Sequence, residues 1–163
     1  MTNKAVFTKD LANKKLHVTR EFAAPLNKVW AAWTESDLLD KWWAPKPWKA
    51  VTKSYSFAEG GTWLYNMAGP EGETHWTRFD FETITPKQGF SLTSKFCDED
   101  GNTPNDYTGM HWHNQFHATE KGTGVEVDLT FDDVAVFENI LAMGFEGGFT
   151  MGLGNLDELL AEA

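Results

Sequence analysis

Cysteine and basic residues are both scarce in this chain of 163 residues. Cys97 is the single cysteine, so the chain cannot form an internal disulfide. The 14 lysines and arginines are outnumbered by 24 aspartates and glutamates, which gives a formal net charge of −10. Proteins that bind nucleic acid or anionic membranes need clustered positive charge. The composition therefore argues against both kinds of partner.

The sequence also lacks an apolar run long enough to span a bilayer. Residues 1–10 contain lysines but no apolar segment of the kind that signal peptides carry. No repeat, linker or low-complexity tract divides the chain, and its length suits one domain. We expect a cytoplasmic protein with a loose N-terminal arm at residues 1–14 and a single domain at residues 15–163.

Aromatic residues, by contrast, are abundant. They make up 14% of the chain, with 8 Trp and 12 Phe. Such large rings can fill a core, and they also line binding sites for apolar ligands. Composition alone leaves both interpretations open.

Alternation of apolar and polar residues predicts strands over much of the chain from Lys15 onward. Residues 125–131 are the clearest case, with Val125, Val127, Leu129 and Phe131 on one face. Turn sequences rich in Gly and Pro separate such runs, at residues 59–61, 69–72, 86–89 and 121–124. Strands joined by short turns form antiparallel sheets, so we predict an antiparallel sheet of about seven strands.

Three segments have helical character instead. Residues 25–33 predict a short helix with Pro25 in its first turn, and Thr34 or Ser36 can cap a second one that ends before Pro45 and Pro47. Residues 134–160 keep a helical apolar stripe, and Asp132 or Asp133 can cap them. Glycines inside this stripe leave two options, a break near residues 147–148 or one long helix kinked there. We favour the single long helix, since the stripe keeps its phase.

This order of elements predicts an α+β fold. The last helix is the only large element that can cover the apolar face of the sheet, so the sheet should curve around it. A gap is then expected beneath the two short helices, where a pocket would form.

Several motifs resemble the START-like SRPBCC superfamily, and within it the branch related to the C-terminal domain of the heat-shock protein 90 ATPase activator. They are Arg20-Glu21-Phe22 with Ala24-Pro25, Val29-Trp30-Ala31-Ala32-Trp33-Thr34, Leu38-Leu39, Trp42-Trp43 with Pro45, Gly60-Gly61-Thr62-Trp63, Met67, Gly69-Pro70-Glu71-Gly72, Phe145-Glu146-Gly147-Gly148-Phe149 and Leu156-Asp157-Glu158-Leu159-Leu160. The resemblance covers about residues 15–162 and implies the helix-grip fold, also called START-like or Bet v-like. It implies no one activity, because the superfamily includes lipid carriers, hormone-binding proteins, cyclases and chaperone regulators. Phe149 stands where the branch usually has Trp.

The histidines are the first candidates for chemistry. His111 and His113 share one face of a strand, but Trp112 and Phe116 should take the interior face, so we expect the histidines outside and predict no metal site. His75 shares the parity of Phe79 and is expected to point inward, as a buried neutral ring or, alternatively, as a general acid or base.

Other polar candidates have structural explanations. Arg20 and Lys53 are inward cations by parity, for which pairing with a structural acid is the commoner outcome and binding of a ligand carboxylate the alternative. Cys97 lacks a histidine or cysteine partner in sequence, and the acidic loop Asp98–Asp106 lacks the spacing of a calcium loop.

The aromatic interior is the remaining candidate site, and the alternative is that its rings fill the core completely. The predicted cavity lining is Trp33, Trp42, Trp63, Tyr65, Met67, His75, Phe79, Phe81, Phe96, Trp112, Phe116, Phe145 and Phe149. The leading hypothesis is a non-catalytic domain that binds a small apolar or aromatic ligand between sheet and C-terminal helix, with no cofactor. The alternatives are a protein-interaction module that regulates a chaperone ATPase, and a cyclase or hydrolase that uses His75.

Overall fold

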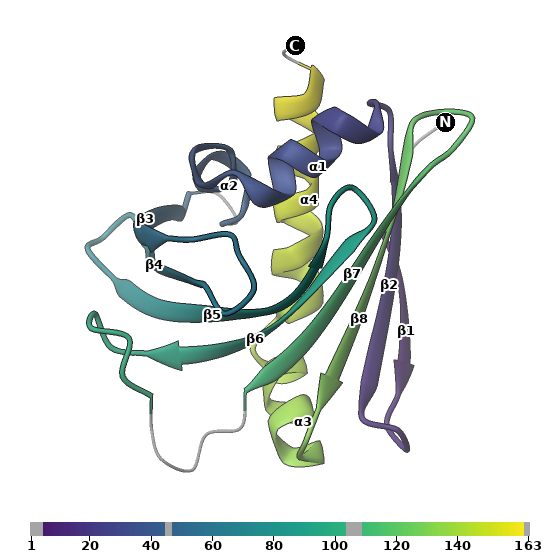
Figure 1. Cartoon of the computed structure of the whole chain (residues 1–163). Coiled ribbons are helices and arrows are strands. Elements are labelled where there is room, and N and C mark those ends of the chain that lie inside the picture. The colour runs from purple at the N-terminus through teal and green to yellow at the C-terminus, as the bar shows by residue number, and fades with distance from the viewer. Residues whose placement is uncertain (1–4, 45–46, 104–108, 162–163) are drawn as a thin grey trace.

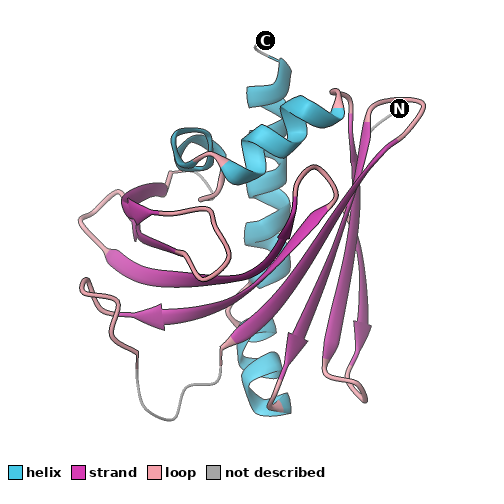
Figure 2. Ribbon diagram, in the orientation of Figure 1, coloured by secondary structure: helices cyan, strands magenta, loops and turns pink. Residues whose placement is uncertain are grey.

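The computed structural model describes residues 5–44, 47–103 and 109–161. Pro45, part of the predicted acidic loop and both ends of the chain lie outside the described residues. An eight-stranded antiparallel sheet curves around a C-terminal helix, with two short helices laid across that helix (Figures 1 and 2). The strands are β1 (Val6–Asp10), β2 (Lys15–Phe22), β3 (Lys49–Tyr55), β4 (Thr62–Ala68), β5 (Thr74–Thr85), β6 (Gly89–Cys97), β7 (Met110–Ala118) and β8 (Thr123–Phe131). The helices are α1 (Leu26–Thr34), α2 (Ser36–Trp42), α3 (Val134–Ala142) and α4 (Phe145–Ala161).

The strand order is β1-β2-β8-β7-β6-β5-β4-β3. Each strand pairs with the next one in sequence except β2, because the long connection through α1 and α2 carries the chain from β2 to the far edge. This is the predicted helix-grip arrangement. The additional strand is β1, which lies in the segment predicted to be a loose arm and pairs with β2 from Val6–Thr19 to Asp10–Lys15. Lys14, with a φ of 53°, lies in the turn that brings the two strands together.

The C-terminal helix is divided, contrary to the prediction of one long helix. Asp133 caps α3 by accepting a hydrogen bond from the Ala135 amide at 2.8 Å. α3 ends at Ala142, and Gly144 has a φ of +87°, a conformation that only glycine adopts without strain. The break therefore falls at Gly144 and not at residues 147–148, which lie inside α4.

Glycine also allows α4 to approach the end of α2 closely. A Cβ atom at Gly152 would lie 3.2 Å from the Trp43 carbonyl oxygen and 3.4 Å from that of Trp42. Asn155, one turn further on, donates from Nδ2 to the Ala44 carbonyl oxygen at 3.0 Å. The same amide also donates to the carbonyl oxygen of Trp42, the last residue of α2, at 3.5 Å. Carbonyls at a helix end lack partners within the helix, and Ala44 just beyond it is buried, so Asn155 satisfies acceptors that burial would otherwise leave unpaired.

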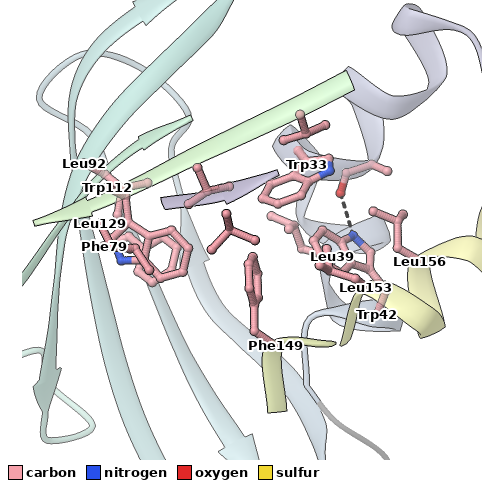
Figure 3. Packing of buried hydrophobic residues seen from close by; sticks show 14 of the residues in the cluster. Trp33, Leu39, Trp42, Phe79, Leu92, Trp112, Leu129, Phe149, Leu153 and Leu156 are labelled. Atoms are coloured by element: carbon pink, nitrogen blue, oxygen red, sulfur yellow. Dashed lines mark hydrogen bonds between the residues drawn. The ribbon is translucent and has the colours of Figure 1, made fainter. Parts of the chain in front are cut away.

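The core lies between the sheet and these helices (Figure 3). On the sheet side, Trp112, Phe79 and Leu129 project toward α4, as the alternation predicts. On the other side, Trp33 and Trp42 of the short helices meet Leu153 and Leu156 of α4, and Phe149 lies between the two groups.

Candidate functional site

A cavity of about 360 Å³ opens between the inner face of β4–β7 and the junction of α3 with α4. Its volume is within the range of small-molecule sites. Its wall is largely aromatic and thioether, formed by Trp43, Trp48, Tyr65, Met67, His75, Thr77, Phe79, Ser94, Lys95, Phe96, Met110, Trp112, Ile140, Met143, Gly144, Phe145, Gly148 and Phe149. Among the described residues, none from α1 or α2 lines the cavity. The cavity therefore lies beside the short helices, whereas the sequence predicted a pocket beneath them.

Trp43, the residue that directly follows α2, holds the aromatic wall together. Its ring centroid lies 5.7 Å from those of both Phe79 and Trp112, and 6.2 Å from that of Phe149. On the helix side Phe145 stacks on Phe149 at 5.4 Å. Rings in such contact stabilise one another beyond the area they bury, which favours a wall with a defined shape.

Tyr65 places a hydroxyl group in this wall. Trp43 Nε1 donates to the Tyr65 hydroxyl at 2.9 Å, and the Thr77 hydroxyl interacts with the same group. Burial raises the pKa of Tyr65 to about 12, although these two hydrogen bonds act in the opposite direction. Tyr65 is therefore a neutral phenol at physiological pH.

Ser94 provides a second hydroxyl in the cavity wall. It lies on β6 beside Trp112, whose Nε1 donates to Ser94 Oγ at 2.9 Å. Both partners are buried. The two indole–hydroxyl pairs thus fix the orientation of Trp43 and Trp112, whose faces form much of the wall.

The cavity lining contains basic residues but no acidic ones. His75 and Lys95 are among the lining residues, and no Asp or Glu is among the described residues that line the cavity. Lys95 alternates with Ser94 and Phe96 along β6, so its side chain leaves the strand on the outer face of the sheet. His75 is exposed, and its ring lies 5.5 Å from that of Trp48. This differs from the buried position expected for His75, because the residue sits at the outer end of β5 where the sheet is no longer covered. In a chain with a net charge of −10, a wall without carboxylates is a distinct local environment.

The structure brings together most of the predicted lining residues. Those on the cavity wall are Tyr65, Met67, His75, Phe79, Phe96, Trp112, Phe145 and Phe149. The others belong to the filled core and not to the wall, and these are Trp33, Trp42, Trp63, Phe81 and Phe116. They face the interior as their parity requires, but neighbouring rings occupy the space in front of them.

Sequence reasoning missed Trp43, Trp48, Met110 and Met143 as wall residues, along with Ser94 and Thr77. Trp43 follows the end of a helix and Trp48 precedes a strand. Neither residue belongs to a helical or strand repeat, so no such repeat predicts which way its side chain points. The available signal for Trp43 was its place beside Trp42 in the family motif. Ser94 and Thr77 share parity with Phe96 and Phe79, and this parity alone could have identified them.

Arg20 and Lys53, the two cations predicted to point inward, have other roles. Arg20 is buried and forms a two-pronged ion pair with Asp157 of α4, while donating to the Glu21 carbonyl oxygen at 2.8 Å. Arg20 therefore pairs with a structural acid, the commoner of the two outcomes considered for it. Lys53 does not face inward at all, because a bulge between Thr52 and Ser54 changes the alternation. Its ammonium lies over the ring of Trp76 and donates to the Glu99 carbonyl oxygen.

The histidines of β7 point to the outer face of the sheet, as their alternation with Trp112 predicts. His111 bonds to Thr93 at 3.0 Å and to Asp132 at 3.0 Å. Between β2 and β8, His17 Nδ1 lies 2.5 Å from Asp128 Oδ1. Desolvation raises the pKa of Asp128, but the hydrogen bond from His17 and the charges of His17 and Lys15 outweigh it and lower this pKa. Within the described residues no group of three His, Cys, Asp or Glu is arranged to hold a metal ion.

Two further candidates remain on the outside. A groove of similar volume crosses the outer face beside Gly124, lined by Thr19, Glu21, His117 and Glu126 among others. Most of its lining residues are polar or charged, and none of them is aromatic except His117. Cys97 is a partly buried free thiol whose pKa is raised by desolvation and by Asp98, which disfavours the reactive thiolate.

Fold and cavity together define a helix-grip domain of the START-like class. The sequence profile of the "Activator of Hsp90 ATPase homolog 1-like protein" family matches residues 23–161, so the chain belongs to this family. None of the described helices is long and apolar enough to cross a membrane. Among curated proteins, no relative matches the sequence significantly.

Solved structures of similar proteins extend over the whole domain. Protein Ms6760 from Mycobacterium smegmatis is 27% identical, with a TM-score of 0.88 and 96% of each chain covered. A protein from Arthrobacter aurescens is 26% identical, with a TM-score of 0.89 and coverage of 97% of this chain and 92% of that one. Protein NE0264 from Nitrosomonas europaea is 27% identical, with a TM-score of 0.81 and coverage of 93% and 96%.

Proposed function

We propose that this protein binds a small apolar or aromatic ligand in the cavity between β4–β7 and the α3–α4 junction, without catalysis and without a cofactor. The observation that carries the proposal is the cavity itself, about 360 Å³ in volume and walled by Trp43, Trp112, Phe145 and their neighbours. An apolar space of this size forfeits contacts that a filled core would make, so a ligand with matching rings gains both dispersion and desolvation energy. The scarcity of cysteine supports placing this activity in the cytoplasm.

The test is a fluorescence titration with N-phenyl-1-naphthylamine, an uncharged aromatic probe, combined with native mass spectrometry of the purified protein. We expect saturable binding of one probe per chain. Phe145→Ala removes a ring that stacks on Phe149 in the wall, and it should weaken probe binding about tenfold.

Phe57→Ala is the matched control. Phe57 is also half-buried and surrounded by rings, 5.1 Å from Phe81 and 5.3 Å from Phe90, but it does not line the cavity. Its loss should leave probe affinity within about twofold. Absence of saturable binding by the unmodified protein would refute the proposed function.

Membership of the family supports a second candidate, a contact with a chaperone ATPase of the heat-shock protein 90 type. The net charge of −10 offers an acidic surface for such a contact. Saturable binding to the purified chaperone that weakens with added salt would support it, since exposed charges are screened by salt.

An enzymatic use of His75 has less physical support. The ring is exposed and packs against Trp48, and no carboxylate of the described residues lines the cavity beside it. A general base needs an orienting partner or a perturbed environment.

A further inference from the structure

The hydrogen bonds inside the cavity wall leave hydroxyl hydrogens without acceptors. The first case is the chain formed by Trp43, Tyr65 and Thr77. Trp43 donates to the Tyr65 oxygen at 2.9 Å, and Thr77 lies directly opposite Tyr65 in the pairing of β4 with β5. These two hydroxyl groups carry two hydrogens, and a bond between them uses at most one. At least one hydrogen therefore remains, and neither hydroxyl donates to any other of the described residues.

Ser94 repeats this situation on β6, the strand next to that of Thr77. Its oxygen accepts from Trp112 Nε1 at 2.9 Å, and within the described residues this is the one side-chain hydrogen bond that Ser94 makes. The Ser94 hydroxyl hydrogen is therefore also free to donate. Ser94 is only 6% exposed, so water outside the cavity cannot satisfy it.

The ionisable groups inside the wall can all donate. His75 donates from at least one ring nitrogen, and Tyr65 stays protonated because its pKa is raised to about 12. No carboxylate of the described residues lines the cavity, so the wall offers no acidic partner for an ion pair with a cationic amine.

We infer that the ligand carries a carbonyl-type acceptor oxygen, as an aryl ketone or an aryl carboxylate, and that this oxygen accepts from Ser94 or from the Tyr65–Thr77 pair. This rests on the proposed function and specifies the chemistry of its ligand. A ligand ammonium has no lone pair with which to accept, and a ligand hydroxyl adds another donor, whereas a carbonyl or carboxylate oxygen only accepts and so satisfies the unpaired hydroxyl hydrogens. The apolar body of the ligand lies against Trp43, Trp112 and Phe145.

The experiment compares naphthalenes that differ in one group, by displacement of N-phenyl-1-naphthylamine from the full chain. The probes are 2-acetylnaphthalene, 2-naphthoate, 2-ethylnaphthalene and 2-(aminomethyl)naphthalene. We expect the ketone or the carboxylate to bind about tenfold more tightly than the ethyl compound, because one hydrogen bond to an otherwise unpaired donor is gained, and the amine to bind most weakly.

Two variants assign the effect to residues. Ser94→Ala should reduce the advantage of 2-acetylnaphthalene over 2-ethylnaphthalene, while Thr93→Val, which removes a buried hydroxyl from the outer face of the same strand, should leave it unchanged. Direct comparison of 2-acetylnaphthalene with 2-naphthoate distinguishes the two sources of the carbonyl oxygen.

The ratio between the two probes separates a polar contact from a general change in the wall. Equal losses for the acetyl and ethyl compounds in Ser94→Ala would overturn this inference, as would an amine that binds as tightly as the ketone. In both of those results the apolar probes still bind, so the proposed function survives. Failure of all four naphthalenes to displace the bound probe would also overturn the inference, whereas only an absence of saturable probe binding would refute the proposed function.

Discussion

The space between the sheet and α4 has two parts that differ in how they are filled. Around the C-terminal half of α4, Trp33 and Trp42 meet Leu153 and Leu156, and all four side chains are buried (Figure 3). Around the N-terminal end of α4, the rings of Phe145 and Phe149 contact that of Trp112, with centroids 6.1 and 5.9 Å apart, and all three line the cavity of about 360 Å³. We call these the filled half and the open half.

The difference follows from what covers each half. The filled half has a third layer, because α1 and α2 lie across α4 and contribute two tryptophans to it (Figure 1). The open half is covered by the α3–α4 junction, where the helix breaks at Gly144 and offers a single ring, that of Phe145, next to the break. Curvature of the sheet alone therefore does not create the cavity; the absence of a second helical layer does.

Truncating one ring in each half should give the largest contrast. Trp42 is 1% exposed and donates from Nε1 to the Ala32 carbonyl oxygen at 2.8 Å. Trp42→Ala should lower the free energy of unfolding by about 3–5 kcal/mol, because the side chain leaves a cavity that its neighbours cannot refill. Urea denaturation measures this loss.

Phe96→Ala is the counterpart in the open half, since Phe96 is 40% exposed at the cavity mouth. Its loss should cost about 1 kcal/mol or less. Similar costs for the two variants would mean that the open half is as well packed as the filled one, and the difference between the halves would then disappear.

Alternation along the strands predicts which face a residue occupies but not how deep the space before it is. It correctly places Trp63 and Phe81 on the inner face, yet neither of them lines the cavity. Trp43 and Tyr55 pack against Trp63, and Tyr55 and Phe57 pack against Phe81. Alternation within β4 or β5 does not predict contacts with rings that come from other segments.

The helix break shows a second limit of sequence reasoning. Gly144, Gly147 and Gly148 are equally permissive in sequence, and only the backbone geometry, with a φ of +87° at Gly144, distinguishes the first. Family motifs add what periodicity lacks, since the Trp42-Trp43 pair marks the residue at the centre of the wall.

Asn155 offers a test of intermediate size in the filled half. Asn155→Ala removes the Nδ2 donor that the Ala44 carbonyl oxygen uses, and it leaves this buried acceptor unpaired. The free energy of unfolding should fall by about 1–3 kcal/mol. Asn139→Ala, at an exposed position of α3, is the control and should change it by about 0.5 kcal/mol or less. A cost near zero at Asn155 would show that the end of α2 does not depend on α4.

The smallest expected effect separates the two halves by its sign. At Gly147, near the open half, a Cβ atom would meet nothing within 4 Å, so Gly147→Ala should stabilise the protein by about 0.5–1 kcal/mol through helix propensity. At Gly152, in the filled half, the same atom would lie 3.2 Å from the Trp43 carbonyl oxygen, a backbone atom that the neighbouring rings hold in place. Gly152→Ala should therefore be destabilising by about 1 kcal/mol, since the overpacking exceeds the gain in propensity. Thermal unfolding of both variants measures the two signs, and a stabilised Gly152→Ala would show that α4 can move away from α2 at little cost.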